Sequence, residues 1–420
     1  MTNGAPIQVS FCLARPPRLS YLCVHFPGPV LGPHVGTVFG PAAGTPAVRC
    51  VNPPLGHHPG LRVVDDPSTF DYFVYTARPR PGASDLHRLP KPTKGFRDQD
   101  TAIVRCSDSR YVITVLRNTL APLEFRLQLY DSDTQRWTSR LLRVQEPERD
   151  RVLPIPDSAT ELSFHRSTKT IALGPTTVGW VDLWRGILFC DVLDERPVLR
   201  DMPLPKPARC NRGYFCRGGS SGRRDITVVT LPDQSQSQVN LIKYVEMGTR
   251  PGNVHHSSSS SDDDDVVRDY WTATIWTMPV PIASWKDWHK DCTIDVGNMV
   301  IDNPRHCVLL LAALPGLTVD PEEGAAVTLS RLLASHPTLG LGMDGDVAVY
   351  FLSKVDRNAR EGWVIAVGTK DNMLQGIAKL DDRKNFAFRR FYRPTEISKY
   401  LTKATGEGGR LVRTRLSRSK

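Results

Sequence analysis

The stretch "VGWVDLWRGILFCDVLDERPVLRDMPLP" at residues 178–205 decides the fold class. Apolar and polar residues alternate along it, which is the period of a strand with one buried face. The chain turns at Arg185 and Gly186, turns again in the acidic cluster after Asp191, and ends in prolines. The stretch therefore predicts short antiparallel strands joined by tight turns.

The same arrangement occurs earlier in the chain. The stretch "RLQLYDSDTQRWTSRLL" aligns with "ILFCDVLDERPVLRDMPL" so that Asp131 matches Asp191, sixty positions later. Each copy has an apolar strand, an aspartate, a charged turn and a second strand that ends in leucines. A polar turn suits this place because its acidic side chains can accept hydrogen bonds from the backbone.

Further units of strand, turn and strand follow at residues 224–247, 338–355 and 362–380, the last with a turn at 370–372. Four-stranded antiparallel units that recur at about 50 residues or more are typical of a β-propeller. The predicted fold is all-β, a propeller of six or seven four-stranded blades. A pair of β-sandwiches is the alternative, since hairpins alone would also fit it.

Composition agrees with many strands and turns. The 420 residues include 34 prolines and 31 glycines, which break helices and form turns. We predict one propeller domain over residues 1–404, an acidic Ser/Asp-rich surface loop at 252–268, and a disordered basic tail at 405–420. The tail holds about half of the formal charge of +10, so it suggests nucleic-acid binding as one possible use.

The cysteine pattern and the apolar segments limit the class of protein. Nine cysteines are scattered without a CxxC pair, which argues against zinc-ribbon and thioredoxin motifs. No secretory signal is visible at the N-terminus. The longest apolar segment, residues 308–319, is too short to span a bilayer. We expect a monomer in the cytoplasm or nucleus, with no membrane, cofactor or metal.

Several motifs resemble the DUF1618 proteins, a large family from grasses and related plants. They include "VGWVDLWRGILFCDVL", "DYWTATIWTMP", "WKDWHKDCTIDV" and "HPTLGLGMDGDVAVYFLSKVD", and the opening "PIQVSFCLARPPRLSYLCVH" is also similar. The resemblance implies a core at about residues 178–320 and a propeller related in plan to kelch and F-box-associated domains. It implies no catalytic residue. The insert "HHSSSSSDDDDVVRD" departs from the family pattern.

Tryptophans, aspartates and a glycine form the structural signature of these motifs. Trp180 and Trp184 are expected on one strand, on the same side, and Trp285 and Trp288 in a short helix or turn. We predict that the tryptophans pack between blades; a cage that stacks on a ligand is the alternative. The signature residues are Trp180, Asp182, Trp184, Gly186, Asp191, Trp271, Trp276, Trp285, Trp288 and Trp363.

Two polar segments are candidate sites. In "CRGGSSGRRD" (216–225), backbone amides and Arg217, Arg223 and Arg224 are a possible contact for a polyanion, although the Gly-Lys-Ser/Thr end of a P-loop is missing. A flexible hairpin turn is the competing interpretation. In "SSSSSDDDD" (257–265), the possible phosphoacceptors Ser259, Ser260 and Ser261 each precede an acidic residue by three positions. A plain solvated loop is the competing interpretation there.

The function favoured by the sequence is a non-enzymatic platform that binds another protein through its loops. One alternative is an enzyme with a site at the propeller channel. GxSxG and HExxH are missing, and Asp287, His289 and Cys292 are closer together in sequence than the members of a catalytic triad usually are. A second alternative is a nucleic-acid-associated protein that acts through the basic tail.

Overall fold

The fold is described from a computed structural model of the chain. The described residues are 8–12, 14, 16–25, 37–39, 47–51, 70–76, 85–92, 96–107, 109–157, 164–232, 238–250, 270–296, 299, 301, 303–313, 329, 332–341, 346–354, 361–380 and 411–415. They form two compact units: unit 1 is residues 1–15, 19–204 and 395–420, and unit 2 is residues 16–18 and 205–394. The prediction of one domain over residues 1–404 stays a prediction.

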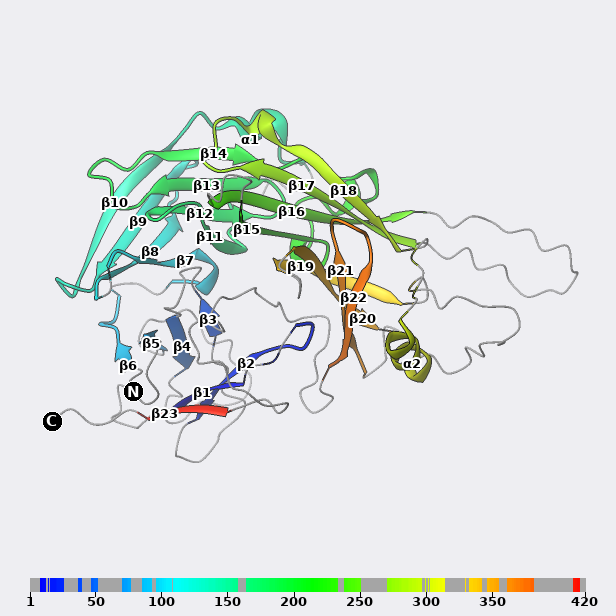
Figure 1. Cartoon of the computed structure of the whole chain (residues 1–420). Helices are drawn as coiled ribbons and strands as arrows, with labels where there is room; N and C mark the ends of the chain where they lie inside the picture. Colours follow the sequence, from blue (N-terminus) through cyan, green and yellow to red (C-terminus); the bar gives the residue numbers. More distant parts are fainter. Residues whose placement is uncertain are drawn as a thin grey trace, which may run out of the picture. The chain divides into compact units, whose positions relative to one another are not determined.

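Unit 1 is built mainly of antiparallel strands, most of which follow one another along the chain (Figure 1). One sheet has three strands, β1 (Gln8–Cys12), β2 (Tyr21–His25) and β23 (Leu411–Arg415). A second sheet has four strands, β3 (Thr37–Phe39), β4 (Ala47–Val51), β5 (Phe70–Thr76) and β6 (Asp85–Arg88). The next are β7 (Thr101–Arg105), β8 (Tyr111–Asn118), β9 (Glu124–Asp131) and β10 (Arg136–Gln145), then β11 (Lys169–Ala172), β12 (Thr177–Asp182), β13 (Gly186–Asp191) and β14 (Leu199–Pro203). A short parallel pairing of β10 with β14 joins these last two sheets.

Unit 2 repeats the plan twice. One sheet is β15 (Arg224–Pro232), β16 (Gln238–Arg250), β17 (Tyr270–Pro279) and β18 (His289–Asp295), and the other is β19 (Leu333–Leu341), β20 (Val347–Lys354), β21 (Trp363–Gly368) and β22 (Leu374–Lys379). The described α-helices are α1 (Glu148–Val152) in unit 1 and α2 (Pro304–Ala313) in unit 2. The all-β class and its four-stranded antiparallel unit are therefore confirmed, while the count of six or seven blades stays a prediction.

The predicted repeat has a physical basis in its aspartates. Asp131 and Asp191 each end the third strand of their sheet. The Oδ1 atom of Asp131 accepts the N–H of Asp133 at 2.9 Å, and Asp191 Oδ1 accepts the N–H of Leu193 at 3.0 Å. In the last sheet Asp371 Oδ1 accepts the N–H of Met373 at 3.0 Å. In each of these sheets the aspartate thus stabilises the turn into the fourth strand.

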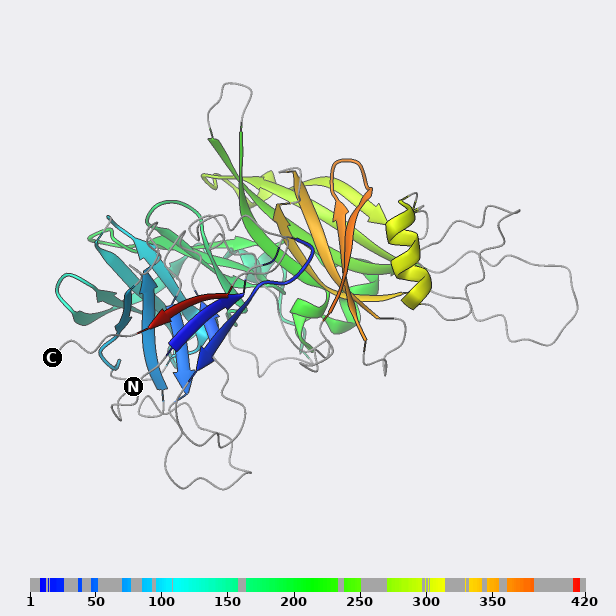
Figure 2. The same ribbon diagram turned by 60° about the horizontal axis from the view of Figure 1, so that its bottom comes forward.

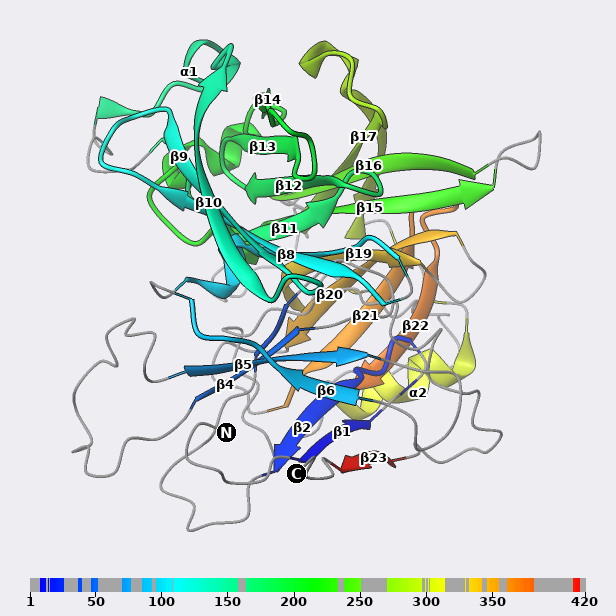
Figure 3. The same cartoon turned by 90° about the vertical axis from the view of Figure 1, so that its left-hand side faces the viewer.

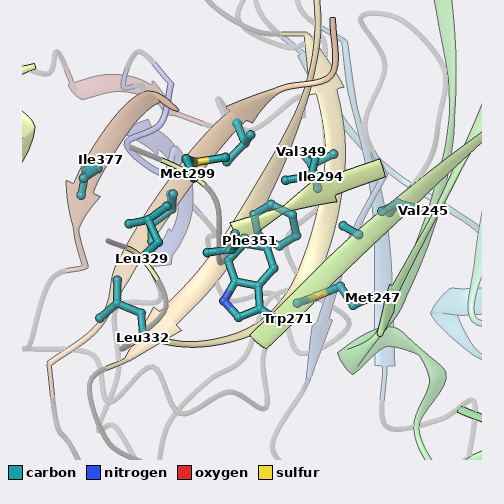
Figure 4. Close-up of a cluster of buried hydrophobic side chains, with 14 of the residues drawn as sticks. Val245, Met247, Trp271, Ile294, Met299, Leu329, Leu332, Val349, Phe351 and Ile377 are labelled. Atoms are coloured by element: carbon teal, nitrogen blue, oxygen red, sulfur yellow. The ribbon is translucent and has the colours of Figure 1, made fainter. Parts of the chain in front are cut away.

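Apolar faces of successive sheets pack together inside each unit. In unit 2, side chains of β16, β17, β20 and β21 form the largest cluster, in which the rings of Trp271 and Phe351 pack together (Figure 4). The centres of these two rings are 4.6 Å apart. In unit 1, one cluster joins the β7–β10 sheet to β11–β14, and a second joins it to β5. Burying a large side chain contributes about 1.5–3 kcal/mol, so these clusters stabilise each unit.

The tail differs in part from its prediction. Leu411–Arg415 is strand β23, which pairs antiparallel with β1, so strands from the two ends of the sequence share a sheet (Figure 2). The sequence "LVRTR" has β-branched residues at alternate positions, which favours a strand when an unpaired edge is available. The other tail residues lie outside the described part of the chain.

One signature residue is on a different element from the one predicted. Trp180 lies on β12, but β12 ends at Asp182, and Trp184 lies in the turn before β13. Asp182 ends the strand because its Oδ1 accepts the N–H of Trp184 at 3.0 Å, two residues on. The predicted turn is confirmed, but it comprises residues 183–185, and Gly186 already begins β13. The prediction that Trp180 and Trp184 share a strand is wrong.

Candidate functional site

The strongest candidate surface is the segment "KPARCNRGYFCRGGSSGR" at residues 206–223, here called the arginine loop. It connects β14 to β15 and contains five cations and no aspartate or glutamate. Most of these cations are exposed, and the side chain of Tyr214 in the same loop is 50 % exposed. The cations are Lys206, Arg209, Arg212, Arg217 and Arg223.

Short 3-10 turns shape the arginine loop. The chain forms η4 (Arg209–Tyr214) and η5 (Ser220–Gly222), and η5 lies in the segment 216–225, for which a flexible hairpin turn was one interpretation. Between them Cys216 has a φ of 59°, a left-handed conformation that reverses the chain. Phe215 is buried and anchors this reversal. The hairpin prediction is wrong because the loop folds onto β16 instead of pairing with itself.

A buried carboxylate holds the first half of the loop. Glu246 on β16 accepts the N–H of Ala208 at 3.1 Å and the Nδ2 of Asn211 at 2.8 Å. The same Oε1 atom accepts the guanidinium of Arg224 at 2.7 Å. The side chains of Arg224 and Glu246 are 0 % and 4 % exposed. The loop is therefore positioned by a charged network that is closed to water.

The second half of the loop is held by backbone and ring contacts. Arg223 accepts the N–H of Met247 at its carbonyl at 2.7 Å, and its guanidinium lies 4.0 Å above the centre of the Tyr214 ring. A cation over an aromatic face contributes about 0.5–1 kcal/mol at an exposed site. A Cβ on Gly248 would lie 3.0 Å from Cys210 Sγ, so the loop and β16 are in close contact there. These contacts join both halves of the loop to one rigid strand.

The three arginines proposed for polyanion binding have different surroundings. Arg224 begins β15 and its side chain is fully buried against Glu246, so it does not face a ligand, and its role in the prediction is corrected. Arg217 is exposed, and Arg223 is half-buried against Tyr214. For Arg217 and Arg223, polyanion contact stays a prediction. The sequence did not distinguish these adjacent arginines because the start of β15 decides which one faces inward.

The signature residues of unit 1 pack inside its sheets. Trp180 is fully buried and donates its Nε1–H to the carbonyl of Asp100 at 2.8 Å. A Cβ on Gly186 would lie 2.5 Å from the Met202 carbonyl oxygen, so only glycine fits between β13 and β14. Asp182 also accepts the N–H of Arg166 at 3.0 Å.

In unit 2 the signature tryptophans differ in exposure. Trp271 and Trp363 are buried, whereas Trp276, Trp285 and Trp288 are half-buried. Trp285 lies in the predicted short helix, η6 (Trp285–Asp287), which Ser284 and Asp287 cap. Trp288 follows it and contacts the edge of the Tyr244 ring, with ring centres 6.1 Å apart.

A second buried network, which the sequence did not reveal, surrounds Phe164 in unit 1. Arg149 on α1 donates from Nε to Asp201 on β14 at 2.6 Å, and both side chains are 0 % exposed. The Nη1 atom of Arg149 lies 2.8 Å from His165 Nδ1. Arg185 donates to the Phe164 carbonyl at 2.7 Å. The partners are separated by 16 to 52 positions, so no local pattern identifies them.

His165 makes the stability of this network depend on pH. Burial, and then the nearby charge of Arg149, hold the His165 pKa well below its usual value. The unfolded chain therefore binds a proton, near pH 6.5, that the folded chain does not bind, and stability falls as pH drops below this value. For this one histidine, each pH unit below 6.5 lowers the free energy of unfolding by at most about 1.4 kcal/mol.

We expect His165→Gln to reduce this loss, because glutamine can accept the Arg149 hydrogen bond but does not titrate. The measurement is urea unfolding at a series of pH values from neutral to about 5. Burial also lowers the pKa of His306 and His336, so part of the slope remains. The control is His289→Gln, at an exposed position, with an unchanged slope. Equal slopes for His165→Gln and the wild type would contradict the assignment.

The residues considered for an enzyme do not form a triad. Asp287 uses its carboxylate to cap η6, where it accepts the N–H of Ser284 at 3.0 Å. Burial raises the pKa of the Cys292 thiol to about 11, which keeps it protonated at neutral pH. His289 Nδ1 lies 3.5 Å from the Asp287 carbonyl oxygen and is exposed. This set therefore supports no nucleophilic chemistry.

Other sequence-based candidates lie outside the described residues. They are Ser259, Ser260 and Ser261, whose phosphorylation stays a prediction, and most of the basic tail. In the part of the chain that the structure describes, no three or more His, Cys, Asp or Glu side chains are grouped to hold a metal ion. None of the described helices is both long enough and apolar enough for a membrane span.

Comparisons with known proteins come from a family model and a solved structure. A crystal structure of the Cps50 (Swd1) β-propeller domain from Myceliophteria thermophila is similar over 84 % of this chain and 89 % of that chain, at 7 % identity and a TM-score of 0.32. No curated protein matches. The family model described as "Protein of unknown function (DUF1618)" matches residues 180–350, which include the central tryptophan motifs. The predicted resemblance to the DUF1618 family is therefore confirmed over this segment of the chain.

Proposed function

We propose that this protein is a non-enzymatic interaction platform that binds another protein through the arginine loop. The observation that supports it most is that an exposed, purely basic loop is fixed to β16 by the buried contacts of Glu246. Binding normally costs conformational entropy when a loop becomes ordered. A loop that is already held in place avoids most of that cost.

The composition of the loop suits a protein contact. Tyrosine and arginine are enriched among the residues that contribute most to protein–protein affinity. Tyr214 is half exposed and carries the Arg223 guanidinium on its face. Arg209, Arg212 and Arg217 add exposed basic side chains to the same loop. Since the segment has no carboxylate of its own, its charge is complementary to an acidic partner surface.

Charge reversal on the loop tests the proposal. The variant Arg209→Glu, Arg212→Glu and Arg217→Glu changes exposed side chains and leaves the Glu246 contacts intact. We expect this variant to capture about tenfold or more less of the partner protein from cells than the wild type does. The reason is that close charge pairs contribute at least about 1.5 kcal/mol to affinity. Quantitative mass spectrometry of the captured proteins is the measurement.

The matched control reverses three exposed cations elsewhere in unit 2, Lys286, Lys290 and Arg305, and should leave capture unchanged. An equal loss of captured protein in both variants would show that net charge, and not the loop, is responsible. No loss of captured protein in the loop variant would exclude the loop as the contact. Turnover of a metabolite by the purified protein would instead support the alternative of an enzyme.

A further inference from the structure

Strands β8 and β9 of unit 1 place two arginines directly opposite each other. These strands and β10 run side by side in one sheet (Figure 3). The register pairs Arg117 with Arg126, and Arg126 with Leu141 on β10, so the three side chains share one face of the sheet. Arg143 on β10 lies on the same face because it is two residues from Leu141. We call Arg117, Arg126, Leu141 and Arg143 the arginine face.

This pairing is unfavourable in the isolated protein. Like charges directly opposite each other destabilise a sheet, and the Cβ atoms of such a pair are about 4.5–5.5 Å apart. Among the described residues, no ion pair involves Arg117, Arg126 or Arg143. Glu124, opposite Arg143, is the one carboxylate that the register places on the exposed end of this face. Three arginines against one glutamate leave a net charge of +2.

Apolar surface borders these charges. Leu141 is 52 % exposed beside Arg126, and Leu120, in the turn that connects β8 to β9, is fully exposed. Farther along the same face, Tyr130 is buried and packs on Trp137, with ring centres 5.3 Å apart. The exposed end of the face thus offers guanidinium groups and Leu141, with Leu120 in the adjoining turn, while these two aromatic rings are engaged in packing.

We infer that the arginine face is a second binding site, for an acidic peptide segment with apolar residues between its carboxylates. A carboxylate between Arg117 and Arg126 would accept charge-assisted hydrogen bonds from both and relieve their repulsion. The exposed leucines would take the apolar residues of the peptide. A nucleic acid is less well matched, because proteins bind single strands by stacking the bases on exposed aromatic rings.

The inference is independent of the arginine loop, since the two surfaces belong to different units. It is therefore tested in the variant whose loop carries the three glutamates, so that the loop does not contribute. The probe is a fluorescein-labelled peptide of alternating glutamate and leucine, measured by fluorescence anisotropy. We expect it to bind this background, and Arg117→Met with Arg126→Met to weaken binding by about tenfold or more.

Three controls keep the result interpretable. Arg305→Met, on an exposed arginine of unit 2, should leave the affinity unchanged. A glutamine–leucine peptide should bind at least about tenfold more weakly than the glutamate–leucine peptide. Arg126→Met alone should fold and melt at the same temperature or about 1–3 °C higher, because it removes the repulsion between the opposed arginines.

Two outcomes would overturn the inference. One is equal peptide affinity of the background protein and the double methionine variant. The other is a single-stranded oligonucleotide of the same charge that binds more tightly than the peptide and loses affinity with the same substitutions, which would assign the face to nucleic acid. Loss of protein capture by the loop variant with retained peptide binding would separate the two surfaces.

Discussion

Replacing Glu246 by leucine is expected to lower the free energy of unfolding by about 3–5 kcal/mol, because Arg224 would remain charged and buried without its partner. Glu246 accepts hydrogen bonds from Arg224, Asn211 and the Ala208 N–H, and each of them loses its carboxylate in the variant. The measurement is urea unfolding followed by circular dichroism.

A double variant separates charge burial from packing. Arg224→Met with Glu246→Leu removes both charges, so we expect it to recover most of the lost stability. It should remain below the wild type because Asn211 and Ala208 still lack their acceptor. The loop should also become more sensitive to protease in the single variant, since its anchor to β16 is lost. A double variant as unstable as the single variant would show that the ion pair is not the cause.

Replacing Asp201 by leucine is the second change with a large expected effect, again about 3–5 kcal/mol. Asp201 accepts one hydrogen bond from the Arg149 side-chain Nε at 2.6 Å and one from the Arg149 backbone N–H at 2.9 Å. These two bonds fix α1 against β14. Without it, the buried guanidinium keeps His165 as a neighbour but loses the carboxylate that it pairs with. Urea unfolding of the whole chain measures the loss.

The matched variant here is Arg149→Met with Asp201→Leu, which removes both charges from the space beside Phe164. We expect it to be more stable than Asp201→Leu alone. Because the Arg149 charge contributes to the low pKa of His165, the double variant should also lose less stability below pH 6.5 than the wild type. If stability fell by less than about 1 kcal/mol in Asp201→Leu, the pair would not be desolvated as described.

Local sequence patterns determined the strands, their turns and the basic character of the loop. Alternation of apolar and polar residues predicted the four-stranded units, and the matched Asp131 and Asp191 mark equivalent turns because an aspartate accepts the N–H two residues later. The segment at 216–225 also pointed to part of the basic loop. These features are short-range, so the sequence carries them directly.

Only the tertiary structure decided which charged side chains meet. Arg223 and Arg224 are adjacent and identical, yet one stacks on Tyr214 and the other is buried on Glu246, since the first residue of β15 faces inward. The opposition of Arg117 and Arg126 depends on strand register, and the pairing of Arg149 with Asp201 joins residues 52 positions apart. Register and burial are set by how sheets pack, and no local period of the sequence records that.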